Sequence, residues 1–179
     1  CDPQGALLTL DEIYTGFGRT GRWFAGEHEG TVPDLICLGK ALTGGFPLSA
    51  CVGKGSLMDH AWPPASGEAI HTSTFLGHPV GCAMALAQIH ELERRGLCAA
   101  SGDKGAFLIR QLQRATKNIL PRFQCAVRGL GLMAGIEPWR LDGTPAMEES
   151  LEIIKRLLHR GFIFLPEGEH ANVISFTPP

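Results

Sequence analysis

The chain has 179 residues, which is enough for one ordinary domain or for a domain with a small second unit. Sixteen Lys and Arg stand against eighteen Asp and Glu, so the formal charge is −2 and the chain lacks the basic excess of a protein that binds nucleic acid or an anionic membrane. With 44% hydrophobic and 19% charged residues, the composition excludes intrinsic disorder.

The first half of the chain alternates short apolar runs with glycine-rich loops, which predicts an α/β unit. Strands are expected at 6–10, 34–38 and 48–52, and their lack of polar alternation is typical of a mostly parallel sheet buried on both faces. A helix is predicted over 79–95, with Pro79 at its first position and Gly96 just past its end. The first half of this helix is apolar nearly all round and is therefore expected to be buried.

The second half has a different pattern, with amphipathic helices among its predicted strands, and predicts a small α+β unit. Helices are expected over 103–120 and from Pro145 to Gly161, the latter with Thr144 as its N-cap. Strands are expected at 123–127, 132–136, 162–165 and 173–176. The side chains expected to be buried in the two helices are Leu108, Leu112, Ala115 and Ile119, then Met147, Leu151, Ile154 and Leu158. The change from the α/β pattern to the α+β pattern near residues 97–105 predicts a domain boundary there.

The cysteines and the ends of the chain indicate its setting. Six cysteines lie far apart, at positions 1, 37, 51, 82, 98 and 125, which favours reduced thiols in a cytoplasmic protein over a disulfide framework. The longest stretch without Asp, Glu, Lys or Arg, 69–90, contains histidines, a proline and hydroxyls, so it is not predicted to span a membrane. The chain begins at Cys1 rather than Met and stops directly after an apolar run, so we expect a piece of a longer protein.

Two polar residues follow neighbouring predicted strands. Asp11 comes directly after the first strand and Lys40 after the second. Ligands of open parallel sheets bind beyond the carboxyl ends of the strands, so both side chains are expected to face one crevice. A lysine that is partly removed from water can act as the nucleophile that forms a Schiff base, and a fixed carboxylate opposite it is a suitable partner for a pyridinium nitrogen. The pair therefore indicates a pyridoxal phosphate site.

Other interpretations of these residues are weaker. An Asp-Glu pair after a strand is often only a turn or a cap, and a lone Gly-Lys is usually a solvated loop. Gly39-Lys40 is not a phosphate-binding P-loop, because no glycine stands five residues before Gly39 and Ala41 replaces the Ser or Thr. His60, His71 and His78 match no spacing of metal ligands, so no metal site is expected.

Longer motifs around Asp11 and Lys40 are more specific. The segment LTLDEIYTGFGRTG (8–21) is followed by PDLICLGKALTGG (33–45) and then by HTSTFLGHP (71–79), with a step of 29 residues from Asp11 to Lys40. In this order they closely resemble the signature of the class III pyridoxal phosphate-dependent aminotransferases, the ω-aminotransferase-like group. The resemblance implies the second half of a fold-type I large domain over 1–100 and a small C-terminal α+β domain over 101–179, incomplete at its end.

The resemblance also implies roles for individual residues, with pyridoxal 5′-phosphate as the cofactor. Asp11 would bind the pyridine nitrogen, and Lys40 would form the Schiff base and then move the proton between the substrate Cα and the cofactor C4′. Ile13 has the position that packs on one face of the ring. Tyr14 stands where many members have a Gln that bonds the phenolic oxygen, a bond that a tyrosine hydroxyl could also make.

Further implications concern the assembly and the activity of the complete protein. Ser73 and Thr74 match a loop that reaches the cofactor phosphate of the neighbouring subunit, which implies a homodimer with shared sites. The complete enzyme would transfer an amino group from an amine or amino-acid donor to a keto acid. Family members are more than twice this long, so the piece is not expected to be active alone. The alternatives are an aminomutase or decarboxylase of the same superfamily, or a non-catalytic cofactor-binding homologue.

One position departs from the family pattern. In many members an Arg stands three residues before the Pro-Pro pair of the last strand and grips a substrate carboxylate with its planar fork. Here Ser175 takes that place. Either another cation does the work, with Arg128 and Arg140 nearby in the sequence, or the preferred donor carries no carboxylate on its reacting carbon.

Overall fold

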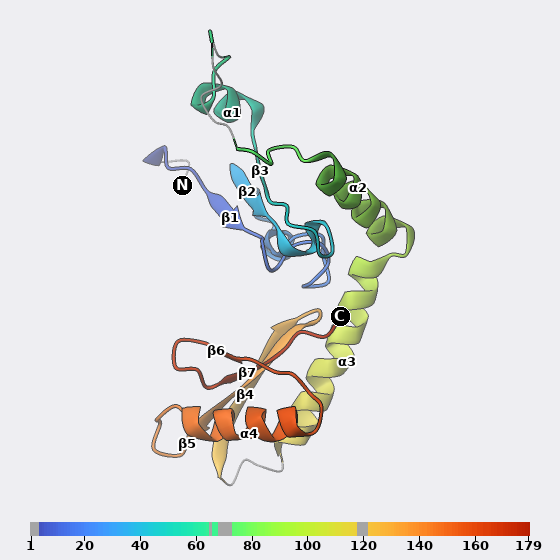
Figure 1. The fold of residues 1–179 in the computed structure, drawn as a ribbon. Helices are drawn as coiled ribbons and strands as arrows, with labels where there is room; N and C mark the ends of the chain where they lie inside the picture. Colours follow the sequence, from blue (N-terminus) through green and yellow to red (C-terminus); the bar gives the residue numbers. More distant parts are fainter. Residues whose placement is uncertain (1–3, 65, 68–72, 118–121) are drawn as a thin grey trace. The chain divides into compact units, whose positions relative to one another are not determined.

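The computed structural model describes residues 4–64, 66–67, 73–117 and 122–179 (Figure 1). The chain divides into two units, the first made of Cys1–Gly18 and Arg22–Cys98 and the second of Arg19–Gly21 and Ala99–Pro179. None of the helices in the described part is long and apolar enough to cross a membrane.

The first unit is built on a three-stranded sheet of β1 (Thr9–Asp11), β2 (Leu35–Leu38) and β3 (Ala50–Gly53). β1 pairs with β2 in parallel, but β2 pairs with β3 in antiparallel, so the sheet is mixed where the sequence predicts a mostly parallel one. The connection explains the difference. Residues 39–49 contain only the short 3-10 helix η3 (Lys40–Leu42), whereas a return to a parallel strand needs a crossover of about a dozen residues or more.

Three further helical segments complete this unit: η2 (Ala25–Glu29), α1 (Gly55–Ala61) and α2 (Pro79–Arg94). α1 is absent from the sequence prediction. It has seven residues and no buried side chain, so it carries no apolar periodicity that would reveal it. α2 begins at Pro79, as predicted, and ends at Arg94, one residue before the predicted end.

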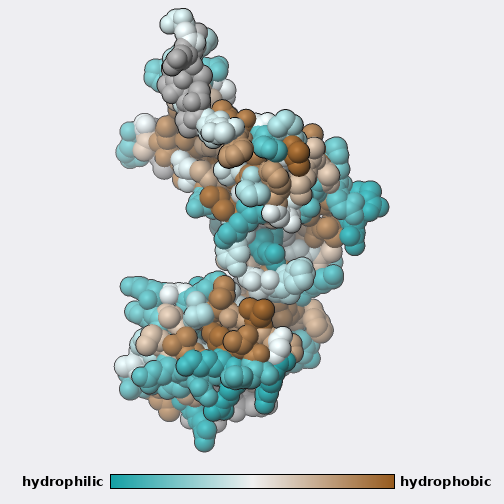
Figure 2. Space-filling view, in the orientation of Figure 1, coloured by the Kyte–Doolittle hydropathy of each residue, from teal (hydrophilic) through white to brown (hydrophobic). Residues whose placement is uncertain are grey.

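The prediction that the first half of α2 is buried is wrong. Only Gly81, Ala85 and Leu92 are buried, which marks one face of the helix. The other side exposes apolar side chains such as Val80 (52% exposed) and Leu86 (58% exposed), and Figure 2 shows hydrophobic residues, in brown, at the surface. An apolar composition all round predicts burial, but the described residues supply a packing partner for one face only.

The core of the first unit lies around the loop that follows β2. Its buried members are Phe17, Leu38, Leu42, Ala85 and Leu92. Leu38 and Leu42 stand two residues before and two residues after Lys40, which is itself exposed. Fully burying a leucine side chain stabilises the fold by about 1.5–3 kcal/mol, so the two leucines anchor the turn and leave the lysine outside.

The second unit is a four-stranded antiparallel sheet with the strand order β4-β5-β7-β6, accompanied by helices α3 and α4 (Figure 1). Its elements are α3 (Leu97–Lys117), β4 (Phe123–Leu130), β5 (Met133–Arg140), α4 (Met147–His159), β6 (Pro166–Glu167) and β7 (Val173–Phe176). β4 is longer than predicted because its pairing with β5 continues to the tip of the hairpin, and β5 is longer because residues 137–140 pair with 123–126 at the other end. β7 has the predicted bounds.

Both helices of the second unit begin elsewhere than predicted. α3 begins at Leu97 rather than at residue 103, and the Ser101 hydroxyl inside it donates to the Arg19 carbonyl and accepts the Leu132 N–H. α4 begins at Met147 rather than at Pro145. Thr144 does not cap it, because its N–H and its hydroxyl both donate to the Asp142 carboxylate, at 2.9 and 2.7 Å.

The run 162–165 is not the predicted strand. Phe162, Ile163 and Leu165 are exposed, and the strand at this edge, β6, comes directly after them. Small side chains, rather than the large apolar ones, are the buried residues of the helices: Ser101, Gly105 and Thr116 in α3 and Ser150 in α4. The side chains predicted to be buried there are half-buried (Leu108, Leu112, Leu151, Ile154) or exposed (Ala115, Met147, Leu158), and Ile119 lies outside the described residues.

Glycine allows the closest approach of backbones in the second unit. A Cβ atom on Gly105 of α3 would stand 1.9 Å from the carbonyl oxygen of Gly131, in the turn between β4 and β5. Gly131 has a φ of +54°, in the left-handed region that favours glycine. Gly102, one turn earlier in α3, has more room, with its nearest neighbour 3.7 Å from a Cβ, which is ordinary contact.

These two positions give a matched pair of substitutions. Gly105→Ala is expected to lower the free energy of unfolding by about 1–3 kcal/mol or more, because the added methyl group must displace backbone. Gly102→Ala is expected to be neutral or to stabilise by up to about 1 kcal/mol, because alanine is the better helix former. Thermal unfolding of the complete protein measures both. Equal effects of the two substitutions would contradict this packing.

Candidate functional site

The two residues singled out by the sequence lie at one edge of the first sheet. Asp11 is the last residue of β1 and is the register partner of Cys37 in β2. Lys40 follows β2 by two residues, and the Glu12 N–H donates to the Cys37 carbonyl at 3.0 Å, which continues the parallel pairing beyond β1. The carboxylate and the amine are both exposed and stand at the carboxyl ends of neighbouring parallel strands, where such sheets bind ligands.

The Asp11 carboxylate is oriented by its own loop. Oδ1 accepts the backbone N–H of Ile13 at 3.0 Å, a turn in which aspartate commonly bonds the backbone two residues on. Ile13 is 37% exposed, and its Cγ2 atom lies 3.2 Å from the place where a Cβ on Gly39 would stand. Gly39 thus lets the backbone that leads to Lys40 pass beside Ile13.

Lys40 has an unusual backbone conformation. Its backbone φ angle is +27°, in a region that residues other than glycine rarely adopt. Such strain persists where the surroundings fix it and is concentrated at functional sites. The Lys40 Nζ atom lies 4.0 Å from the centre of the Tyr14 ring, a cation–π contact that places the half-buried tyrosine beneath the amine.

Ser73 and Thr74 are placed apart from this group. Both are exposed in the turn before α2, where the Ser73 carbonyl accepts the Leu76 N–H at 3.1 Å. Among the described residues, no hydrogen bond or ring contact joins them to Asp11 or Lys40. The structure therefore brings together four of the six predicted residues, and the preceding His71 and Thr72 lie outside the part that it describes.

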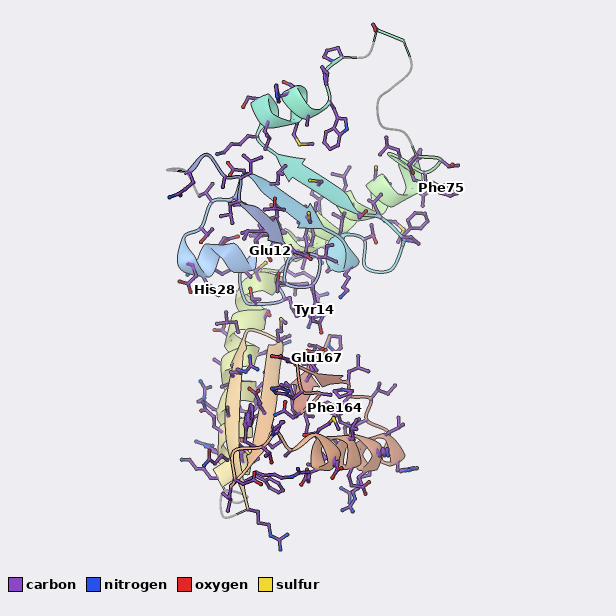
Figure 3. All side chains as sticks on the ribbon, turned by 90° about the vertical axis from the view of Figure 1, so that its left-hand side faces the viewer. Glu12, Tyr14, His28, Phe75, Phe164 and Glu167 are labelled. Atoms are coloured by element: carbon purple, nitrogen blue, oxygen red, sulfur yellow. The ribbon has the colours of Figure 1, made fainter. Side chains whose placement is uncertain are left out.

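Glu12 is a residue of this site that the sequence analysis missed. Its side chain is 2% exposed, with Oε1 accepting the Gly26 N–H at 2.9 Å and Oε2 accepting the Thr15 hydroxyl. Figure 3 shows Glu12 and Tyr14 at the end of β1. A buried carboxylate needs such donors. Because Thr15 and Gly26 lie on either side of the glycine-rich loop (16–21), the two bonds of Glu12 hold this loop in place. Alternation along a strand, with Asp11 facing out and Glu12 facing in, is the signal that could have revealed it.

The start of β2 is held by an ion pair. Asp34 Oδ2 accepts the Leu8 N–H at 2.8 Å, and Oδ1 lies 2.6 Å from the Lys54 Nζ. The pKa of the Asp34 carboxyl is lowered mainly by the hydrogen bond from the Leu8 N–H and, to a smaller extent, by Lys54. The end of β2 that is farther from Lys40 is thereby joined to Leu8, before β1, and to Lys54, after β3.

Ser175 lies in a hollow of the second unit. It is buried, its N–H donates to the Leu165 carbonyl at 3.3 Å, and it lines a mainly apolar cavity of about 620 Å³ with residues that include Leu108, Phe164 and Phe176. The two arginines considered as substitutes are both paired. Arg128 lies 2.9 Å from Glu137, and Arg140 lies 2.8 Å from Glu149, whose pKa it lowers.

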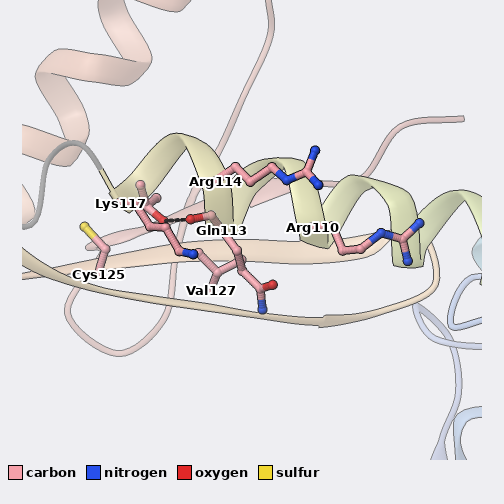
Figure 4. A pocket seen from close by; sticks show the side chains of 7 residues that line it. Arg110, Gln113, Arg114, Lys117, Cys125 and Val127 are labelled. Atoms are coloured by element: carbon pink, nitrogen blue, oxygen red, sulfur yellow. Dashed lines mark hydrogen bonds between the residues drawn. The ribbon is translucent and has the colours of Figure 1, made fainter.

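A second hollow of this unit contains none of the predicted residues. It measures about 450 Å³ and lies between α3, with Arg110, Arg114 and Lys117, and β4, with Cys125 and Val127 (Figure 4). Within the described part of the chain, no group of three or more His, Cys, Asp or Glu side chains is placed to hold a metal ion.

The residues at the sheet edge fit pyridoxal phosphate. An exposed carboxylate suits a protonated ring nitrogen, an exposed primary amine suits an aldehyde, and the half-exposed Ile13 offers an aliphatic surface to a flat ring. All three groups, Asp11, Ile13 and Lys40, belong to the first unit.

Comparisons with known proteins agree with this chemistry. Residues 1–179 match the family model of the class-III aminotransferases. The chain is 40% identical over 184 residues to 5-aminovalerate aminotransferase of Pseudomonas aeruginosa, covering 100% of this chain and 41% of that protein. It is 42% identical over 180 residues to putrescine aminotransferase of Pectobacterium atrosepticum, covering 100% of this chain and 36% of that protein.

A solved structure extends the comparison to the fold. Ornithine aminotransferase of Toxoplasma gondii, described with partial occupancy of PLP (pyridoxal phosphate) at its active site, is similar with a TM-score of 0.84 and 30% identity, covering 100% of this chain and 40% of that one. This likeness confirms the predicted fold class, part of a PLP-dependent transferase. The chain spans less than half the length of these relatives.

The role of Glu12 can be tested by two substitutions of different severity. Glu12→Ala removes both acceptors and leaves the partly buried Gly26 N–H without this bond, so the free energy of unfolding should fall by about 1–3 kcal/mol. Glu12→Gln keeps one oxygen for Gly26, and its amide can donate to the Thr15 hydroxyl, so most of the stability should remain. Urea unfolding of the complete protein compares them, and an equal loss in both variants would contradict the proposed bonds.

Proposed function

The chain belongs to the class III aminotransferase family, and we propose that the complete protein transfers an amino group from an amine or amino-acid donor to a keto acid, with pyridoxal phosphate as its cofactor. The observation that carries the proposal is the exposed Asp11 carboxylate and Lys40 amine at the ends of two neighbouring parallel strands. The relatives named above are aminotransferases. This supports transamination over an aminomutase, a decarboxylase or a non-catalytic homologue.

Each residue at the sheet edge has a separate task in this mechanism. When bound, pyridoxal phosphate supplies an electron sink for the substrate carbon that loses its proton. Asp11 would hold the proton on the ring nitrogen, with one of its carboxylate oxygens fixed by the Ile13 N–H. Lys40 would hold the cofactor through its Nζ atom and would carry the proton from the substrate carbon to the cofactor C4′.

Tyr14 and Ile13 position these groups. The Tyr14 ring beneath the Lys40 Nζ contributes about 0.5–1 kcal/mol at a partly exposed site, which holds the amine without trapping it. We assign the Tyr14 hydroxyl to the phenolic oxygen of the cofactor and the Ile13 side chain to one face of its ring. Both assignments rest on the place of these residues beside Asp11 and Lys40.

The proposed assembly is a homodimer with shared sites. Ser73 and Thr74 lie in an exposed turn apart from the Asp11 and Lys40 group, and we assign their hydroxyls to the cofactor phosphate of a second copy. A hydroxyl bonded to a charged oxygen contributes on the order of 1.5–3 kcal/mol. We place the complete protein in the cytoplasm, in keeping with its free thiols among the described residues.

The substrate preference follows from Ser175. A serine hydroxyl can donate one hydrogen bond but supplies neither charge nor a second parallel donor, so it is a poor partner for a carboxylate. The cavity that Ser175 lines is mainly apolar, and Arg128 and Arg140 are engaged with glutamates. We therefore propose a donor whose reacting carbon carries no carboxylate. Two of the curated relatives are named for 5-aminovalerate and putrescine, compounds whose amino groups are terminal.

Borohydride reduction tests the cofactor attachment. In the complete protein loaded with pyridoxal phosphate, reduction should fix the cofactor on the peptide that contains Lys40, as read by mass spectrometry of a digest. Lys40→Arg keeps the charge but has no primary amine, so the label and the visible absorbance should both be lost. Lys54→Arg, a change at the ion pair with Asp34, is the matched control and should keep both. Labelling of a different lysine would overturn the assignment.

A pair of isomeric donors tests the substrate preference. The complete protein should use 5-aminovalerate with a higher kcat/KM than 2-aminovalerate, whose carboxylate sits on the reacting carbon. Ser175→Arg should raise kcat/KM for 2-aminovalerate by roughly 10- to 100-fold, the effect of one charge-assisted pair. Arg128→Ala and Arg140→Ala should leave the preference unchanged. A wild-type preference for 2-aminovalerate would contradict the proposal, and its selective loss in either arginine variant would show that this arginine binds the carboxylate.

A further inference from the structure

Two cysteines lie side by side on neighbouring strands of the first sheet. Strands β2 and β3 are neighbours in this sheet (Figure 1), and Cys37 in β2 is the register partner of Cys51 in β3. Both are free thiols, Cys51 exposed and Cys37 half-buried. Register partners of neighbouring strands point to the same face of a sheet, so the two sulfur atoms lie on one side.

The hydrogen bonds of the ladder show which kind of pair this is. In an antiparallel ladder, pairs that exchange hydrogen bonds alternate with pairs that do not. The Lys54 N–H donates to the Asp34 carbonyl at 3.2 Å, so the bonded pairs are Asp34 with Lys54, Ile36 with Val52 and Leu38 with Ala50. Cys37 and Cys51 therefore form a non-hydrogen-bonded pair.

This kind of pair has the spacing that a disulfide requires. In non-hydrogen-bonded pairs the Cα atoms are about 4.5 Å apart and the side chains are at their closest. Disulfides span Cα distances of about 4.4–6.8 Å, so Cys37 and Cys51 can be bridged without movement of the backbone. We propose that Cys37 and Cys51 are a reversible oxidation site that forms a disulfide between β2 and β3.

The environments of the two sulfur atoms set the order of the chemistry. Burial raises the pKa of the Cys37 thiol, and the neighbouring Cys51 and Asp11 raise it further, so Cys37 stays protonated while the exposed Cys51 meets the oxidant. With a low-molecular-weight disulfide such as oxidised glutathione, the Cys51 thiolate attacks one sulfur and releases one glutathione thiol. Cys37 then loses its proton, attacks the Cys51 sulfur and releases the second thiol. Two electrons and two protons pass from the cysteines to the oxidant.

The position of the bridge links it to the candidate site. Cys37 is also the register partner of Asp11, so Asp11, Cys37 and Cys51 form one row across the sheet. The bond would join β3 to β2 three residues before Lys40.

Oxidation of the complete, reduced protein with oxidised glutathione tests the proposal. The digest should contain a Cys37–Cys51 cross-linked peptide, lighter than the two reduced peptides by two hydrogen atoms, and dithiothreitol should reverse it. In Cys37→Ser the cross-link should be lost and a glutathione adduct should persist on Cys51. Cys82→Ser, which removes another exposed thiol, should leave the cross-link unchanged. A wild-type protein that accumulates the adduct on Cys51 without a cross-link, or in which both thiols resist oxidation, would overturn the proposal.

Discussion

The parallel pairing of β1 with β2 is the interaction on which the candidate site depends. It sets Asp11 opposite Cys37, and the bond from the Glu12 N–H to the Cys37 carbonyl carries it one residue further. Because side chains alternate along a strand, a slip by one residue would turn Asp11 to the other face of the sheet. The carboxylate and the amine are thus brought to one edge by the backbone hydrogen bonds between β1 and β2.

Each exposed group of the site stands beside a buried anchor. Glu12 is buried directly after Asp11 and ties down the glycine-rich loop, while Leu38 and Leu42 are buried on either side of Lys40. This arrangement can sustain the strained φ of Lys40, because the anchors fix the backbone at both ends of the turn. Stability and chemistry are therefore divided between neighbouring positions of the same short segments.

The sequence predicts the parts of this site that depend on local pattern. The apolar runs that end at Asp11 and before Lys40 mark the two strands, and the motifs around them identify the family. What it does not predict depends on tertiary contacts. Ser101 makes bonds to distant backbone inside α3, and the Tyr14 ring lies under Lys40 by a choice of side-chain conformation. The roles assigned to Ser73 and Thr74 remain predictions, because they require a second copy.

The register of the second sheet bears on how a carboxylate could be bound. Arg128 pairs with Gly135, and Gly135 pairs with Ser175, so the arginine and the serine lie in one row with no side chain between them. To serve at Ser175, however, Arg128 would have to leave Glu137, whose side chain is only 19% exposed and would remain without this partner. Separating a partly buried pair costs more than separating one at the surface. The ion pair with Glu137 therefore keeps Arg128 from serving at Ser175, which supports the proposed donor without a carboxylate at the reacting carbon.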